Sequence, residues 1–139
     1  YIKTMYHEFG HILQQTKNYS TEFNTISTDY QGPSWVNVGD YESRGVTEAL
    51  EMGFISAYAS SEPGEDFVEI LSFYVVYGKE YWERMLSLAG ESGAEKMLRK
   101  YALVKDYLKT KWEIDIEKLE RIVQRRMEEV SDLKLTTLD

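Results

Sequence analysis

A single short motif at the start of the chain constrains both its local fold and its chemistry. Residues 7–11 read His-Glu-Phe-Gly-His. Two residues four positions apart lie on one face of an α-helix, so both imidazoles can bind the same metal ion. Glu8 adjoins the first imidazole and can accept a proton from a water on that ion without binding the metal itself. The alternative is a surface helix that carries these residues by chance.

The sequence around the motif predicts an active-site helix over residues 1–17. Apolar side chains recur there at steps of three and four residues, and we expect them to face a core. They are Ile2, Tyr6, Phe9, Ile12 and Leu13. Gly10 costs about 1 kcal/mol relative to Ala inside a helix. A glycine in this position indicates the close approach of another backbone or of a substrate.

The amino-acid composition excludes several classes of protein and of metal ligand. The 139 residues predict a single domain, 1–139, and eleven Tyr, five Phe and three Trp argue against a disordered chain. A net charge of -8 argues against nucleic acid or an anionic membrane as a partner. No apolar run approaches the roughly 20 residues that span a bilayer. Without cysteine, histidine and carboxylate groups are the metal donors that remain.

The middle of the chain predicts irregular structure with little helix. Polar residues and a Gly-Pro-Ser turn signal predict a long loop over residues 16–45. Apolar side chains within it predict that the loop packs onto the domain; they are Phe23, Ile26, Tyr30, Trp35, Val36 and Val38. We expect a short helix over residues 46–50 and an extended segment over residues 53–59.

Glycine and proline signals divide the second half into helices, so the fold class is mainly α. A third-ligand helix is predicted over about 63–77, between Pro63 and Gly78, and a helical C-terminal part over 79–132. Within that part, one helix ends at Gly90, and Asp115 caps the last. The last helix carries an apolar stripe that we expect to be core; it is Ile116, Leu119, Ile122, Val123, Met127 and Val130.

The third metal ligand must be a carboxylate if the first two are His7 and His11, because the chain has no other histidine. Many acids are available, and composition alone does not choose between them. Glu65 and Glu69 stand out, since they lie four apart on the first turns of an apolar helix. One can bind the metal while the other holds a ligand imidazole by a hydrogen bond. Alternatively, both are ordinary acids favoured by the helix dipole.

The motif at 7–11, followed by Tyr58 and by Glu65-Asp66-Phe67-Val68-Glu69, resembles the lethal-factor type of gluzincin metalloprotease. It is more similar still to a family of zinc metallopeptidases, mostly lipoproteins, from Bacteroidetes. The resemblance covers residues 1–77. It implies Zn²⁺ as cofactor, with each residue in a stated role: His7, His11 and Glu65 as ligands, Glu8 as general base, Glu69 as hydrogen-bond partner of a ligand histidine, and Tyr58 as donor to the oxyanion.

The resemblance also implies a zincin-like fold, a protein or peptide substrate and an extracytoplasmic location. Such domains have an N-terminal half with a small sheet, so we expect residues 1–139 to form the C-terminal, helical half. Two other functions stay open. One is a zinc-binding extracellular module without catalysis, against which the presence of Glu8 argues. The other is a metal-free helical interaction domain that binds through its aromatic segment 30–38.

Overall fold

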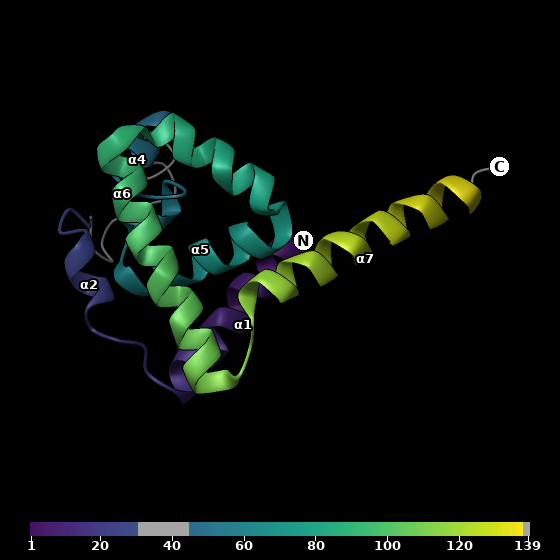
Figure 1. Cartoon of the computed structure of the whole chain (residues 1–139), viewed down its shortest axis with the longest axis horizontal. Coiled ribbons are helices and arrows are strands. Elements are labelled where there is room, and N and C mark those ends of the chain that lie inside the picture. The colour runs from purple at the N-terminus through teal and green to yellow at the C-terminus, as the bar shows by residue number, and fades with distance from the viewer. Residues whose placement is uncertain (31–44, 138–139) are drawn as a thin grey trace.

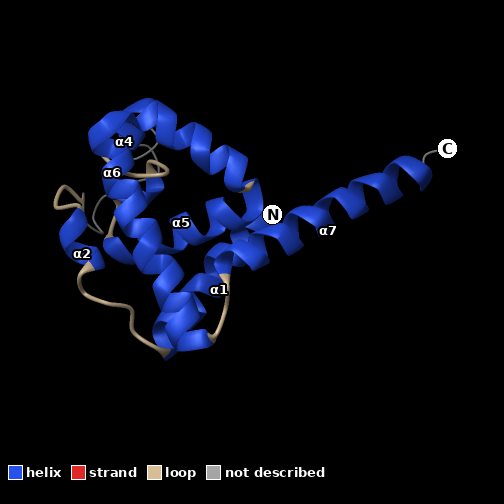
Figure 2. Cartoon of the chain, viewed as in Figure 1, coloured by secondary structure: helices blue, strands red, loops and turns tan. Residues whose placement is uncertain are grey.

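The computed structural model of the chain describes residues 1–30 and 45–137. All regular elements in these ranges are helices, and neither range contains a strand (Figures 1 and 2), which confirms the mainly α fold class. The elements are α1 (Ile2–Thr16), α2 (Phe23–Ile26), α4 (Val46–Glu51), the 3₁₀ turn η2 (Tyr58–Ser60), α5 (Pro63–Tyr77), α6 (Lys79–Trp112) and α7 (Ile116–Thr137). None of the helices in the two ranges has the length and apolarity needed to cross a bilayer.

Helix α5 is the centre of the fold, and it packs against α1, α6, α7 and η2. Pro63 occupies its first turn, where a missing N–H is tolerated. It ends before Gly78, whose φ of 94° favours glycine. Most of its side chains are buried, from Asp66 to Val76 with the exception of Phe73. The predicted bounds of this helix are therefore confirmed.

The two long C-terminal helices also follow the sequence signals. Helix α6 is broken at Gly90, where φ is 74° and ψ is 177°, at the predicted helix end. Asp115 Oδ1 accepts hydrogen bonds from the N–H groups of Glu117 and Lys118, at 3.0 and 3.2 Å, and so caps α7. The apolar stripe of α7 is only partly core, because Ile122 and Val130 are exposed. The second half of α7 extends away from the other helices (Figure 1).

The segment before α5 differs from its prediction. Residues 53–57 form turns and are followed by η2, so the predicted extended segment 53–59 is wrong. Gly53 has a φ of 91° and closes the end of α4, with its N–H donating to Leu50 O at 2.9 Å. Phe54 and Ile55 are both buried, whereas a half-buried strand alternates buried and exposed positions. The short helix predicted at 46–50 is confirmed as α4.

The loop predicted to pack onto the domain does so where it is described. Phe23 and Ile26 are buried, and Tyr30 packs against the core with its ring next to Phe54. Trp35, Val36 and Val38 lie outside the described residues, as does most of the aromatic segment 30–38.

Helix α1 turns a different face to the core from the one that its apolar pattern predicts. Its buried residues are His7, Gly10 and Leu13. The large apolar side chains instead lie on the outside; Ile2, Met5, Phe9 and Ile12 are all exposed. The prediction that Ile2, Phe9 and Ile12 face the core is therefore wrong. The buried face was not apparent from the pattern because it contains a polar residue and a glycine.

Gly10 explains how this face meets α5. A Cβ at Gly10 would lie 2.8 Å from Val68 Cγ1 and 3.2 Å from Leu71 Cδ2. Both partners belong to α5 and are fully buried, so they have no room to move away. The close approach expected at Gly10 is thus that of a neighbouring helix.

A buried ion pair joins α5 to α6 and to the loops. Lys100 Nζ lies 2.8 Å from Asp66 Oδ2 and donates to Gly53 O, also at 2.8 Å. Tyr30 OH donates to the same carboxylate oxygen at 2.6 Å. Burial raises the pKa of Asp66 and lowers that of Lys100, since removal from water disfavours both charges. The pair offsets this penalty and anchors residues 30 and 53 beside the start of α5.

Replacing Gly10 with Ala tests the helix contact. Overpacking of a core typically costs about 1–3 kcal/mol, and the buried partners of Gly10 place this site in the upper part of that range. After the roughly 1 kcal/mol gain in helix propensity, the added methyl group should lower the free energy of unfolding by about 1–2 kcal/mol. Urea denaturation measures the change. Gly64→Ala is the matched control, since the nearest atom to its Cβ is 3.9 Å away. Equal stability of Gly10→Ala and wild type would contradict the contact.

Candidate metal centre

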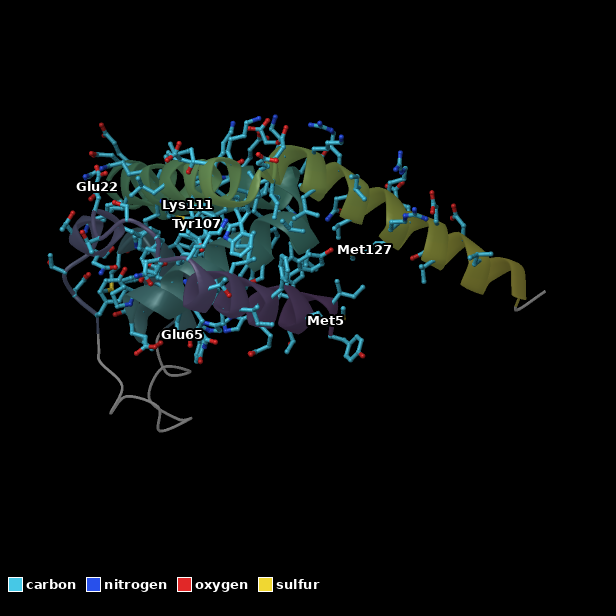
Figure 3. The ribbon with its side chains drawn as sticks, turned by 90° about the horizontal axis from the view of Figure 1, so that it is seen from below. Met5, Glu22, Glu65, Tyr107, Lys111 and Met127 are labelled. Atoms are coloured by element: carbon cyan, nitrogen blue, oxygen red, sulfur yellow. The ribbon has the colours of Figure 1, made fainter. Side chains whose placement is uncertain are left out.

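Three side chains from two helices converge on one point. His7 and His11 project from α1, and Glu65 projects from the first turn of α5 (Figure 3 labels Glu65 beside α1). Glu65 Oε2 lies 2.9 Å from His7 Nε2, and Glu65 Oε1 lies 3.1 Å from His11 Nε2. The two Nε2 atoms are 3.2 Å apart. In residues 1–30 and 45–137, this is the one group of three or more such donors close enough to share an ion.

The donor set fits a zinc ion. Zinc binds imidazole and carboxylate atoms at about 2.0–2.2 Å in a tetrahedral arrangement, which places the ligand atoms about 3.3–3.6 Å apart. The observed separations of 2.9 to 3.2 Å approach that range. His11 and Glu65 are only half-buried, so the group is accessible from solvent. Three protein donors with an accessible side are typical of catalytic rather than structural zinc sites.

Glu69 supports the first imidazole from behind. Its side chain is 2% exposed, and its Oε2 lies 2.9 Å from His7 Nδ1. A carboxylate at Nδ1 holds the proton there and leaves the Nε2 lone pair facing Glu65. The same carboxylate accepts hydrogen bonds from Lys3 Nζ and, at 2.9 Å, from Ser56 Oγ. Glu69 thus lies where the sequence predicts the partner of a ligand histidine.

Gln14 has the corresponding position behind the second imidazole. Its Oε1 lies 3.2 Å from His11 Nδ1, and its Nε2 donates to Gly64 O at 3.2 Å. The bond to Gly64 fixes which end of the amide faces His11, so His11 Nδ1 carries the proton. Both imidazoles therefore present Nε2 to the shared point.

The carboxylates control the charge of the centre. Burial lowers the pKa of His7, but hydrogen bonds to Glu65 and Glu69 outweigh burial and raise it from 6.5 to about 9. Burial raises the pKa of Glu65 and of Glu69, yet the hydrogen bond from His7 is the leading opposing cause, and both pKa values are lowered overall. A cation is therefore favoured between these groups, and a metal ion must displace the proton of His7 to bind there.

Of the two residues predicted to act on substrate, Tyr58 lies next to this group and Glu8 adjoins it along α1. Glu8 follows His7 on α1 and is exposed. Tyr58 is the first residue of η2 and is half-buried, with its ring centroid 5.8 Å from that of His7. The structure thus brings together five of the six predicted site residues from three separate segments, and the sixth, Glu8, adjoins His7 on α1.

Three further residues of the centre were missed from the sequence. Lys3 lies four residues before His7, and Gln14 lies three residues after His11, so helical spacing could have indicated both. Ser56 gave no such signal, because it falls in the segment that was predicted to be extended.

Comparison with known proteins identifies the family. A family model described as "putative zinc-binding metallo-peptidase" matches residues 1–117. A crystal structure of "a putative zinc-binding metallo-peptidase from Bacteroides caccae" is similar, with 36% sequence identity and a TM-score of 0.86. The match covers 95% of this chain and 49% of the other, so this chain spans about half the length of that protein. No curated protein matches. Since the family model matches most of its length, the chain belongs to this zinc-binding metallo-peptidase family.

Proposed function

We propose that the chain carries the zinc site of a peptidase that hydrolyses peptide bonds with an activated water. The observation that supports this proposal best is the convergence of His7, His11 and Glu65, with Glu8 exposed and next to His7 in the sequence. A zinc site that is purely structural has four protein ligands and needs no neighbouring base.

Each residue has a defined task in this mechanism. His7, His11 and Glu65 hold the zinc ion, which when bound lowers the pKa of water and polarises a carbonyl group. Glu8 accepts the proton of the attacking water and later donates it to the leaving amine. Tyr58 donates a hydrogen bond to the oxyanion that develops on the scissile carbonyl.

We further propose a protein or peptide substrate and an extracytoplasmic location, and no nucleic acid partner. The substrate class is supported by the family, and the net charge of -8 disfavours nucleic acid. The location rests on the resemblance to lipoprotein metallopeptidases alone. We propose hydrolysis for a protein of the length of the similar structure, of which this chain covers about half.

Substitution of the three ligands tests the metal site. His7→Ala, His11→Ala and Glu65→Ala should each abolish tight zinc binding, because three protein ligands leave no redundancy. Competition with a chelator measures the affinity, and elemental analysis measures occupancy. Glu62→Ala is the matched control, since Glu62 lies at the same end of α5 but outside the cluster. Full occupancy in His11→Ala would refute the ligand set.

Substitution of Glu69 tests its support of His7. Glu69→Ala should weaken zinc binding about 10- to 100-fold, since that is the usual effect of losing the partner of a ligand histidine. Glu69→Gln keeps an oxygen that can accept a hydrogen bond from His7 Nδ1, so it should weaken zinc binding less than Glu69→Ala. Chelator competition on folded variants, checked by circular dichroism, gives both values. Wild-type affinity in Glu69→Ala would show that the contact does not support the metal.

Substitution of Glu8 and Tyr58 in the full-length protein separates an enzyme from a zinc-binding module. Glu8→Gln should keep its zinc while peptide hydrolysis falls about 100- to 10,000-fold, the usual range for general-base catalysis. Tyr58→Phe should lower kcat with little change in KM, because its donor acts mainly after the oxyanion forms.

Tyr77→Phe is the control for tyrosine substitution, since Tyr77 is exposed at the opposite end of α5. Hydrolysis of a peptide library by Glu8→Gln at the wild-type rate would rule out Glu8 as the base. A zinc-loaded wild type that cleaves no peptide would favour the binding module.

A further inference from the structure

Ser56 connects two parts of the candidate site. Its Oγ donates to Glu69 Oε1 at 2.9 Å and accepts a hydrogen bond from the N–H of Ala59 at 3.1 Å. Glu69 in turn holds His7, whereas Ala59 is the residue after Tyr58 in η2. One hydroxyl group therefore joins the carboxylate behind a proposed zinc ligand to the short turn that carries the proposed oxyanion donor.

The bond from Ser56 to Glu69 differs in kind from the other side-chain bonds of this turn. Ser60 Oγ donates to Ala57 O, and Ser61 Oγ donates to Tyr58 O, at 2.6 and 2.8 Å. Those bonds span three residues each and fix the internal shape of the turn. The bond from Ser56 to Glu69 spans 13 residues and fixes the position of the turn relative to α5.

Glu69 has other partners on the opposite side of its carboxylate. Lys3 Nζ and His7 Nδ1 both contact Oε2, whereas Ser56 contacts Oε1. Loss of the Ser56 hydroxyl should therefore leave the zinc ligands supported and affect mainly the turn that contains Tyr58.

We propose that Ser56 is a positioning residue that holds Tyr58 in register with the metal ligands through Glu69. This inference rests on the proposed function, in which Tyr58 donates to the oxyanion. Ser56 does not touch the oxyanion itself and acts only by holding Tyr58 in place. A displacement of about 1 Å in a positioned group can lower a rate about 100-fold. The role of Ser56 should therefore be visible in kcat and not in zinc affinity.

The experiment compares Ser56→Ala with Ser56→Thr, which keeps the hydroxyl, and with Ser72→Ala. Ser72 is the matched control because its buried hydroxyl bonds to the main-chain oxygen of Glu69 and not to its carboxylate. In the full-length protein, Ser56→Ala should lower kcat about 10-fold or more, with KM and zinc affinity within about twofold of wild type. Ser56→Thr should restore kcat, and Ser72→Ala should leave it unchanged.

A double substitution tests whether the effect passes through Tyr58. Adding Ser56→Ala to Tyr58→Phe should cause no further loss of kcat, because the donor that Ser56 positions is already absent. An additive loss would overturn the proposal. If Ser56→Ala does not fold, Ser56→Cys keeps the size of the side chain with a weaker donor and should show the same loss of kcat.

A spectroscopic measurement on the zinc-loaded chain keeps this inference separate from the proposed enzymatic function. In spectra of protein with ¹³C-labelled tyrosine and histidine rings, the Tyr58 signal is the one that disappears in Tyr58→Phe. Ser56→Ala should shift or broaden this signal while the His7 ring signals stay in place. An unchanged Tyr58 signal, or an equal change at His7, would overturn the proposal even if the full-length protein hydrolyses peptides. A change confined to Tyr58 would support it even if no hydrolysis is found.

Discussion

The candidate site depends on how closely α1 and α5 approach each other at Gly10. Val68 and Leu71 of α5 occupy the space that a side chain at Gly10 would fill. This contact lies between His7 and His11 along α1, so it sets how far both imidazoles stand from Glu65. Separations of 2.9 to 3.2 Å between the three donors therefore follow from a helix contact that involves no polar atom.

The first two turns of α5 combine three acids, and two of them share His7 as a partner. Glu65 faces the imidazoles, Asp66 pairs with Lys100, and Glu69 pairs with Lys3 and His7. Burying a carboxylate is expensive unless a cation and hydrogen bonds compensate for the lost water. Asp66 and Glu69 are both buried, so the chemistry at Glu65 is supported on either side by charges that α6 and α1 neutralise.

Much of this could be predicted from sequence because it follows from spacing. The distance of four residues between His7 and His11 places them on one face of a helix, and Pro63 and Gly78 bound α5. The buried face of α1 could not be predicted, since several large apolar residues of this helix are exposed and the core contact is made at a glycine. The burial of Lys100 could not be predicted either, because lysine is almost never fully buried and its partners at 53 and 66 are distant in sequence.

The ion pair between Asp66 and Lys100 also defines the smallest part of this protein that could hold the site. A peptide that linked α1 to α5 would contain all three proposed ligands together with Glu8, Lys3 and Gln14. It would lack the ammonium group of Lys100, which lies 2.8 Å from Asp66. Asp66 directly follows the proposed ligand Glu65 in the sequence. The Asp66 carboxylate would then take up a proton or move to where water can solvate it, and either change would disturb the first turn of α5. Transfer of this centre into another scaffold therefore requires α6, although α6 supplies no ligand.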